Sequence, residues 1–455
     1  MKQKLNVCLL IYSAIFIISI SSILDANDKE VNTIKHPLPI KVRNYKTLED
    51  ADKDAQYIFR INLSNTNISN LSSKISDFVN LEALDLSDNN LSFLPKEISG
   101  LKKLKYLNLS GNKFTKFPNE IVELENLNVL DIGRNQIVSI PQEITQLKKL
   151  ITLKLSSNKI TSLPPNIFLL QNLKGLYIAS NSIKTLPSDL TQMKNLEILV
   201  VNKNKISKIF PDISKMESLK VLNLSDNQLT VLPKDIGFLK SLQSLNLGYN
   251  FLSGIPNDFV NLEHLTYLNL DGNNIKMFPK KIYNLKMLQT LDMNDNKSQK
   301  LPAEIVNITN LKNLNIRNNK LKSLPPEFNK LIYLNSLDIS NNELTEFPFD
   351  ICSLQYLNQL DLSSNKIQNI PSEIGNLLNL TNLKLDNNLI YRLPQEMTKL
   401  RNLQVLTIGN NNLTKMPVNL ETMYNLRLLY LKENPIPDYE KENLKRLLKT
   451  TKLTF

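Results

Sequence analysis

Hydrophobic and polar positions along this chain repeat with a period of 23 residues over most of its length. A leucine holds its place in every period from Leu81 to Leu426, and an asparagine does so from Asn89 to Asn434 without a single insertion. Within a period, pairs such as Leu84 and Leu86 show the two-residue alternation of a strand that is buried on one face. The pattern therefore predicts one short strand per period.

The second half of each period predicts a short helix. After the asparagine come an aliphatic residue, then typically Leu-Pro, an acidic residue, Ile and Leu, as in NNLSFLPKEISGL. Proline keeps its register from Pro95 to Pro417 and moves by one position only at Pro211. Proline suits the first turn of a helix, and an acidic residue such as Glu97 or Glu373 is favourable near the helix N-terminus. Each unit is expected to run strand, turn, proline, short helix and return.

The unit LxxLxLxxNxLxxLPxEIxxLxx closely resembles the 23-residue leucine-rich repeat, in the style of exported bacterial members of that family. About seventeen copies cover residues 58–436. The resemblance implies an α/β fold: a curved horseshoe solenoid with a parallel sheet on the concave face, short helices on the convex face and the repeated asparagine as a buried ladder. A buried amide has donors and acceptors that can bridge backbone groups of its own unit and the next.

The first 24 residues differ from the rest of the chain. Lys2 and Lys4 precede an uncharged apolar run from Val7 to Leu24, followed by small residues, which indicates a secretory signal peptide in residues 1–24. An uncleaved membrane anchor is the alternative, because a run of about 18 residues is near the minimum that spans a bilayer. The signal predicts a secreted or cell-envelope protein of a bacterium, which meets a membrane only if the segment is uncleaved.

The segments flanking the repeats are expected to cap them, because a terminal unit has no neighbour to cover its core. Residues 25–57 read as a lead-in followed by a helical cap, with TLEDADKDA as its near capping box. Residues 437–455 read as a second helical cap, with Leu444, Leu447 and Leu448 on one face.

Composition and motifs point away from catalysis and cofactors. The chain has 2 Cys and 2 His, and removal of the signal would leave Cys352 without a partner for a disulfide. His36 and His264 lie far apart, so a zinc or copper site is not expected. There is no GxSxG, Walker loop or HExxH motif. We therefore expect no enzyme activity, no cofactor and no metal, with Cys352 as a structural filler.

Function is expected among the variable residues that face outward from the strands. Reading those positions predicts a ligand-binding concave patch over repeats three to nine, made of Tyr106, Val129, Arg134, Lys154, Tyr177, Ile198, Val200, Lys203, Val221, Tyr249 and Phe251. Further along lies a polar acidic stretch: Asp271, Asp292, Asp295, Asp338, Asp361 and Asp386. Grouped aromatic and β-branched residues with basic neighbours are typical of protein-binding surfaces. A solvated strand face is the alternative interpretation.

The net charge of +12 raises the question of a polyanionic partner. Its lysines are scattered outside the predicted strands, at 102–103, 148–149, 280–281 and 441–452, and an export signal argues against nucleic acid. The sequence therefore favours an exported binding protein with a protein ligand on its concave face, such as a host protein. The alternatives are an envelope or adhesive component that binds anionic glycan, and an intracellular signalling scaffold if the N-terminus is not a signal.

The stretch LDMNDNKSQKLPAEI breaks the repeat rule at one position. Ser298 stands where every other unit from 91 to 436 has an aliphatic or aromatic residue. A buried serine there would weaken packing unless its hydroxyl is satisfied. The sequence predicts a local soft spot, with a functional hinge as the alternative.

Overall fold

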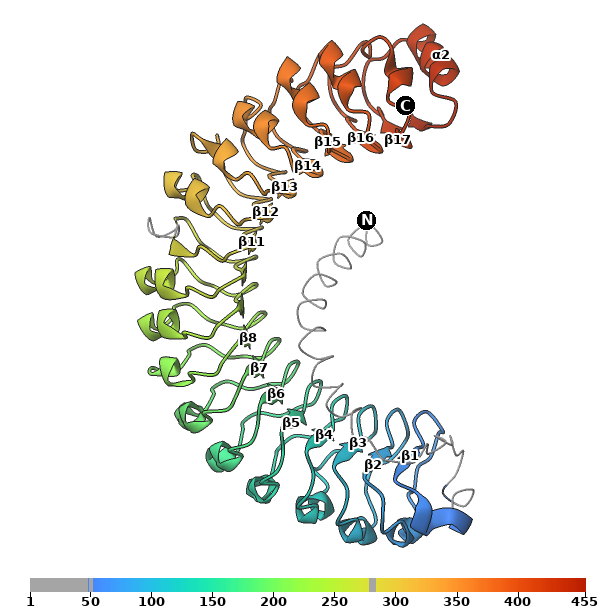
Figure 1. Cartoon of the computed structure of the whole chain (residues 1–455), viewed down its shortest axis with the longest axis vertical. Helices are drawn as coiled ribbons and strands as arrows, with labels where there is room; N and C mark the ends of the chain where they lie inside the picture. Colours follow the sequence, from blue (N-terminus) through green and yellow to red (C-terminus); the bar gives the residue numbers. More distant parts are fainter. Residues whose placement is uncertain (1–47, 49–51, 278–283) are drawn as a thin grey trace.

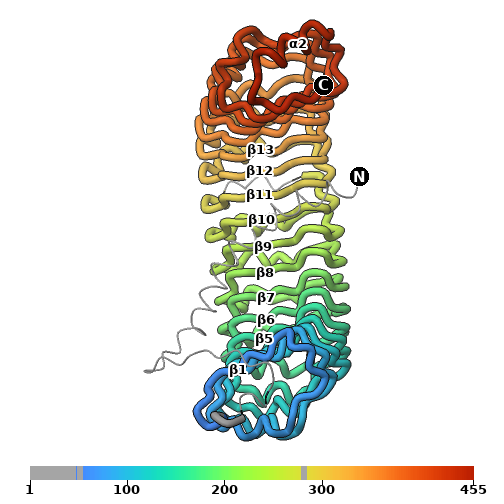
Figure 2. Tube along the Cα trace, turned by 90° about the vertical axis from the view of Figure 1, so that its right-hand side faces the viewer, coloured from blue at the N-terminus to red at the C-terminus, as the bar shows by residue number. Residues whose placement is uncertain are grey.

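The computed structural model describes residue 48 and residues 52–277 and 284–455. They form one curved solenoid whose strands line the concave side and whose short helices lie on the convex side (Figure 1). The coils of successive units stack along the long axis from β1 to β17, with the C-terminal helix at the far end (Figures 1 and 2). This confirms the expected horseshoe. The predicted signal at 1–24 and nearly all of the lead-in lie outside the described residues.

In the described part of the chain, eighteen three-residue strands form one parallel sheet in which each strand pairs with the next along the chain. They are β1 Arg60–Asn62, β2 Ala83–Asp85, β3 Tyr106–Asn108, β4 Val129–Asp131, β5 Thr152–Lys154, β6 Gly175–Tyr177, β7 Ile198–Val200, β8 Val221–Asn223, β9 Ser244–Asn246, β10 Tyr267–Asn269, β11 Thr290–Asp292, β12 Asn313–Asn315, β13 Ser336–Asp338, β14 Gln359–Asp361, β15 Asn382–Lys384, β16 Val405–Thr407, β17 Leu428–Tyr430 and β18 Lys452–Thr454.

The convex helices are short 3-10 helices. They are η1 Asp52–Tyr57, η2 Ser73–Asp77, η3 Lys96–Gly100, η4 Asn119–Glu123, η5 Gln142–Gln146, η6 Pro165–Leu169, η7 Ser188–Gln192, η8 Ile213–Lys215, η9 Lys234–Phe238, η10 Asn257–Asn261, η12 Ala303–Asn307, η13 Phe328–Lys330, η14 Phe349–Ser353, η15 Ser372–Asn376, η16 Gln395–Lys399 and η17 Leu420–Thr422. One α-helix, α2 Asp438–Leu447, follows the repeats.

The bend of the solenoid follows from the different widths of its two sides. Neighbouring strands lie about 4.8 Å apart, whereas a helix with its side chains needs about 10 Å. From β2 to β17 the central residue of each strand is a leucine, for example Leu84 or Leu107, that points inward and is buried. A continuous apolar core therefore runs between the two sides from Leu48 to Leu448.

The repeated asparagine forms the expected ladder, but it bridges to the preceding unit. Asn250 Nδ2 donates to the carbonyls of Leu224 and Leu247 at 3.0 Å, and its Oδ1 accepts from the amide of Leu229 at 2.9 Å. Leu247 belongs to its own unit, whereas Leu224 and Leu229 belong to the unit before it. Each amide thus satisfies three backbone groups that would otherwise be buried without partners.

The residue before each ladder asparagine, and before Thr66 at the same place in the first unit, has a left-handed backbone that was not predicted from the sequence. The positive-φ residues at this place are Asn65, Asp88, Gly111, Arg134, Ser157, Ser180, Lys203, Asp226, Tyr249, Gly272, Asp295, Asn318, Asn341, Ser364, Asn387, Asn410 and Glu433. Most are Asn, Asp, Ser or Gly, the residues that tolerate or favour tight turns. This turn leads the chain from the strand to the return segment.

The repeated proline lies just outside the helix that it precedes. Pro95 and Pro371 are N-cap residues with extended ψ angles of 146° and 156°, rather than members of the first turn. The acidic residue two places later, such as Glu97 or Glu373, does lie in the first turn as expected. At the slipped Pro211, the next residue Asp212 adopts a left-handed conformation and the helix shortens to three residues.

Ser298 is fully buried, as the repeat register predicts. Its Oγ donates to the carbonyl of Ile275 over a long 3.4 Å, and its backbone amide donates to Asn319 Oδ1 at 3.0 Å. The hydroxyl therefore has a partner, but a weak one.

The C-terminal segment covers the last repeat with a helix and then a strand. Leu444 of α2 is buried, and so is Leu448 just after it. The chain then turns back, and β18 pairs in parallel with β17, with Leu453 opposite Leu429. That final strand was not anticipated from the sequence. Within the described part of the chain, no helix is both long and apolar enough to span a bilayer.

Candidate ligand-binding face

The concave face presents the first and third residues of each strand, because the central residue points into the core. Parallel register places equivalent residues side by side along the sheet, as for Tyr177 beside Val200. With about 4.8 Å between strands, the face offers columns of variable side chains at a fixed pitch. Such a surface suits an extended ligand.

Eight of the eleven residues of the predicted patch lie at least partly open to solvent. Tyr106, Lys154, Tyr177 and Val200 are half-buried, whereas Arg134, Lys203, Tyr249 and Phe251 are exposed. The expectation of exposure is wrong for the other three, since Val129 is 8%, Ile198 2% and Val221 1% exposed.

These three buried residues share the first strand position on a crowded part of the sheet. Side chains from adjacent strands are close enough there to cover one another. The ring of Tyr177 lies over the backbone of Gly175, where an added Cβ would approach its Cε2 to 2.9 Å. Val129, Ile198 and Val221 therefore contribute packing beneath the surface rather than contact area.

Arg134, Lys203 and Tyr249 belong to the left-handed turns rather than to the strands. Arg134 forms an ion pair with Asp88 two units earlier, with 2.8 Å between Nη1 and Oδ1. Phe251 follows the ladder asparagine that comes after Tyr249. The exposed part of the predicted patch thus lies largely along the turns beside the sheet.

Five of the six carboxyls of the acidic stretch are buried or half-buried, and only Asp295 among them is exposed. Asp271 accepts from the amide of Asn294 at 2.6 Å and from Asn269 Nδ2 at 3.1 Å, while Asp292 accepts from Asn315 Nδ2. Burial, followed by the charge of Asp292, raises the pKa of Asp271 well above its usual range. Burial also raises the pKa of Asp292, to about 6. Burial therefore makes the negatively charged forms of Asp271 and Asp292 energetically unfavourable.

Three further carboxyls lie along the same stretch. Burial, then the charge of Asp361, raises the pKa of Asp338, which accepts from the amide and hydroxyl of Ser340 at 2.9 and 2.6 Å. Asp361 forms an ion pair with Lys384 at 3.2 Å. At the end of the stretch, burial raises the pKa of Asp386, which accepts from Thr407 Oγ1 and from the amide of Gly409.

A cavity of about 380 Å³ lies on this acidic part of the concave face, across β10 to β15. Its lining includes Tyr267, Asp292, Asn315, Asp338 and Asp361. The sequence predicted this acidic stretch but placed the ligand-binding patch on earlier repeats. Nothing in the one-dimensional pattern signals that these side chains enclose a hollow.

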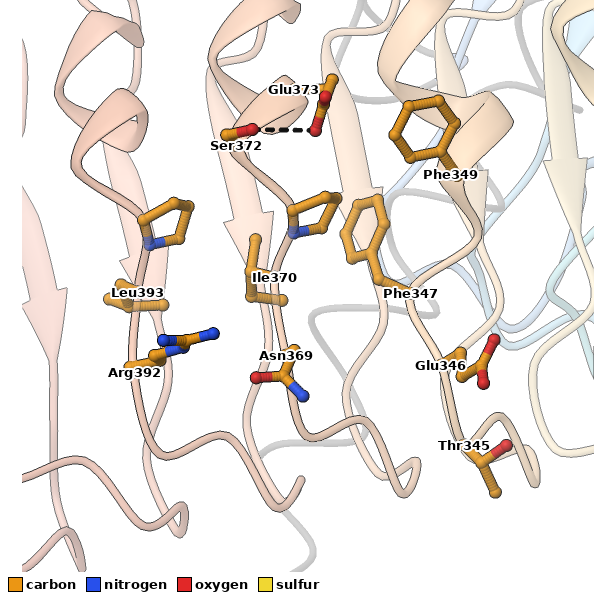
Figure 3. A pocket seen from close by; sticks show the side chains of 12 residues that line it. Thr345, Glu346, Phe347, Phe349, Asn369, Ile370, Ser372, Glu373, Arg392 and Leu393 are labelled. Carbon is orange, nitrogen blue, oxygen red and sulfur yellow. Dashed lines mark hydrogen bonds between the residues drawn. The ribbon is translucent and has the colours of Figure 1, made fainter.

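A second cavity of about 730 Å³ lies on the flank, where the return segments of three units approach helices η14 and η15. Figure 3 shows its apolar row of Phe347, Ile370 and Leu393, with Arg392 near one end. Each of these three apolar residues comes directly before the repeated proline of its unit, a position that is hydrophobic throughout the repeats. The hollow therefore follows from the general geometry of the repeats and identifies no particular ligand.

The remaining candidates for chemistry are isolated side chains. Cys352 is buried in η14, and desolvation, followed by Glu373, raises its thiol pKa to about 12, which makes it a poor nucleophile. His264 is exposed in the segment before β10. Among the described residues, no group of three His, Cys, Asp or Glu side chains could hold a metal ion.

Two protein families together match the whole repeated region, residues 58–436. The family described as "Leucine rich repeat" matches residues 58–114, 148–206, 194–252, 217–275 and 378–436. The family described as "Leucine-rich repeat region" matches 96–159, 257–340 and 304–387. The chain is a leucine-rich repeat protein.

Solved leucine-rich repeat structures resemble the chain over most of its length. One is a leucine-rich repeat protein of Leptospira interrogans, with 36% identity over 91% of this chain and 100% of that one, at a TM-score of 0.79. Another is the plant peptide hormone receptor RGFR1 in complex with RGF2, with 26% identity over 87% of this chain and 74% of that one, at 0.65.

A Listeria monocytogenes internalin, InlF, shares the fold at 22% identity over 79% of this chain and 89% of that one, with a TM-score of 0.57. The comparison with curated proteins found no match. Leucine-rich repeat folds are typically scaffolds for protein–protein interaction, and the receptor complex is one example in which such a protein holds a peptide.

Proposed function

We propose that this leucine-rich repeat protein is an exported, non-enzymatic binding protein that recognises a protein ligand through its concave face. The observation that carries the proposal is the continuous concave sheet, on which variable side chains stand at regular spacing. The aromatic and aliphatic side chains of Tyr106, Tyr177 and Val200 remain partly open on it. Such residues supply much of the binding energy at protein interfaces.

Export rests on the N-terminal sequence, with its basic start and apolar run in residues 1–24. The protein would then reach the envelope or the exterior of a bacterium, where a host protein is one class of ligand. N-terminal sequencing of the mature protein tests this point. An intact N-terminus in a cytoplasmic fraction would instead favour the intracellular scaffold.

A role as a glycan-binding envelope component has less support. The flank lysines that would carry it are already engaged: Lys149 Nζ donates to Asn126 Oδ1 at 2.6 Å, and Lys102 lies 3.9 Å from a carboxylate oxygen of Glu123. Mixed charges of this kind give weak attraction for a polyanion, and salt screens it further.

A photo-crosslinking experiment tests the proposed face directly. Benzoylphenylalanine would replace Val200 on β7 or, as a control, the exposed Gln146 at the end of η5 on the convex side. We expect a discrete protein adduct from position 200 and none from position 146, with the yield at 200 reduced by Tyr177→Ala. Equal adducts from both positions would refute binding through the concave face.

A further inference from the structure

The concave face from β9 to β14 has the opposite charge to the chain as a whole. The chain carries a net charge of +12, yet the outward residues here include Asp271, Asp292, Asp338 and Asp361. Among the residues that the structure describes, carboxyls, amides and Tyr267 are the groups that shift the pKa values of Asp271 and Asp292. None of these groups is a basic side chain. The charge of this pair is thus not neutralised by a neighbouring lysine or arginine.

The carboxyls do not stand on a flat surface. Asp292, Asp338 and Asp361 line the cavity of about 380 Å³ together with Tyr267 and Lys384, whose ammonium group already pairs with Asp361 at 3.2 Å. The cavity is the size expected for one or two side chains, not for a whole folded domain. A ligand group that enters it would meet carboxylate and amide oxygens on several strands.

An aromatic platform lies beside the acidic face. Tyr249 and Phe251 are 53% and 56% exposed. The Tyr249 ring lies against Gly272, where an added Cβ would approach its Cδ1 to 2.5 Å. Desolvation, then the charges of Asp271, Asp295 and Asp226, raise the pKa of Tyr249, so the negative charge of three carboxyls acts on this side chain. Aromatic faces flanked by carboxylates attract guanidinium and ammonium groups.

A buried hydroxyl on the same face supplies an independent observation. Ser244, the first residue of β9, is 7% exposed, and its Oγ has no hydrogen-bond partner. It stands beside Tyr267 in the parallel register, on the concave side of the strand. A buried hydroxyl without a partner is costly, so this part of the face carries a local defect in polar pairing.

We infer that the concave face from β9 to β14 binds an extended, basic segment of a protein partner. One arginine or lysine side chain lies on Tyr249 among Asp226, Asp271 and Asp295. A second enters the cavity above Asp292 and Asp338, since Asp361 is already paired with Lys384. This inference rests on the proposed function and adds a second contact region of stated chemistry, on the strands that follow Tyr106, Tyr177 and Val200 along the same face.

The spacing of the two subsites defines the ligand further. The units of Tyr249 and Asp338 are four strands apart, which is about 19 Å at a strand spacing of about 4.8 Å. An extended chain covers about 3.3 Å per residue, so the two basic residues should be about six positions apart. A metal ion is a poorer occupant, since the described residues offer no three-ligand group.

Two matched fluorescent peptides of about ten residues test the inference on the full chain by fluorescence anisotropy. One carries two arginines about six positions apart, and the other carries glutamines at the same places. We expect the arginine peptide to bind about tenfold or more tightly than the glutamine peptide, with Asp292→Asn plus Asp338→Asn removing the preference.

The matched control is Asp131→Asn. Asp131 occupies the same third strand position in β4 and its pKa is also raised by burial. Two basic side chains, Lys154 and Arg134, act on Asp131, whereas one, Arg317, acts on Asp338 and none of the described basic side chains acts on Asp292. This variant should bind the arginine peptide like the unmodified chain. Equal loss with Asp131→Asn would show that general charge, not this site, holds the peptide, and would overturn the assignment.

The same variants separate a binding role from a structural one. The neutral variants at 292 and 338 should melt at the same or a higher temperature than the unmodified chain while they lose the peptide. Equal affinity for both peptides would overturn the chemistry proposed here. If the photo-crosslinker at position 200 still gave a protein adduct in that case, binding through the concave face would be supported. The inference of a basic segment would nevertheless be wrong.

Discussion

At the scale of single residues, Ser298 interrupts the repeat pattern and weakens the packing of its own unit. The equivalent residues in the adjacent units, Ile275 and Leu321, are fully buried, and Ser298 replaces such a side chain with a hydroxyl held by a 3.4 Å hydrogen bond. In a solenoid each unit contacts only its neighbours, so a weak unit lowers stability without preventing the fold.

Ser298→Leu should therefore raise the free energy of unfolding by about 2 kcal/mol, because it restores apolar packing at a buried site. Chemical denaturation monitored by circular dichroism measures the change. The neighbouring Lys297→Leu is the control, since Lys297 is exposed and should have little effect. A loss of stability in the serine variant would show that the hydroxyl is required, as the hinge interpretation holds.

Asp292 provides a pH-dependent prediction. Burial raises its folded-state pKa to about 6, whereas the ordinary value is 3.8, so the folded protein binds this proton more tightly than the unfolded chain. Stability should consequently be higher near pH 4.5 than at pH 7.5, and should fall as pH rises through about 6. Tyr267 and Asn315 donate to the carboxylate and limit the effect, while Asp271 adds a like charge.

Asp292→Asn should raise stability at pH 7.5 by about 1–3 kcal/mol and flatten the slope between pH 4.5 and 7.5. Thermal melts at several pH values provide the measurement. An unchanged slope in this variant would mean that Asp292 is not the group responsible. If binding also requires the charge, Asp292 is a case in which function is kept at the expense of stability.

At the scale of elements, the convex helices pack so closely that some positions accept only hydrogen as a side chain. An added Cβ on Gly237 in η9 would lie 2.1 Å from the carbonyl oxygen of Asp258 in η10. That neighbour is backbone and cannot rotate away. The close approach fixes how tightly η9 and η10 stack, and with it the local curvature.

Gly237→Ala should destabilise the protein by about 1–3 kcal/mol through overpacking. Gly100→Ala in η3 is a suitable control, since a Cβ there would meet nothing within 4 Å. Denaturant unfolding should show the loss only for position 237. Equal behaviour of the two variants would show that η10 can move away without cost.

At the scale of the whole molecule, the 23-residue register was enough to predict the solenoid, its concave sheet and the asparagine ladder. Such features follow from local alternation and from the need to satisfy buried backbone groups, both of which the sequence displays. The left-handed turn before each asparagine was within reach too, because Asn, Asp, Gly and Ser cluster at that place.

What the sequence did not predict depends on contacts between units. Val129, Ile198 and Val221 occupy outward positions, yet they are buried because residues on adjacent strands cover them. The cavity near Asp338 likewise arises from side chains contributed by β10 to β15. Ser244 gives no sign in the sequence that its hydroxyl lacks a partner.

The final strand, β18, also limits where further repeats can be added to the solenoid. β18 comes from outside the repeated region, and it pairs with β17 through a register that suits the last unit, with Thr454 opposite Tyr430. Units appended after it would find no repeat to continue. A whole 23-residue unit inserted between two existing repeats would lengthen the concave face and leave β18 paired with the last repeat strand.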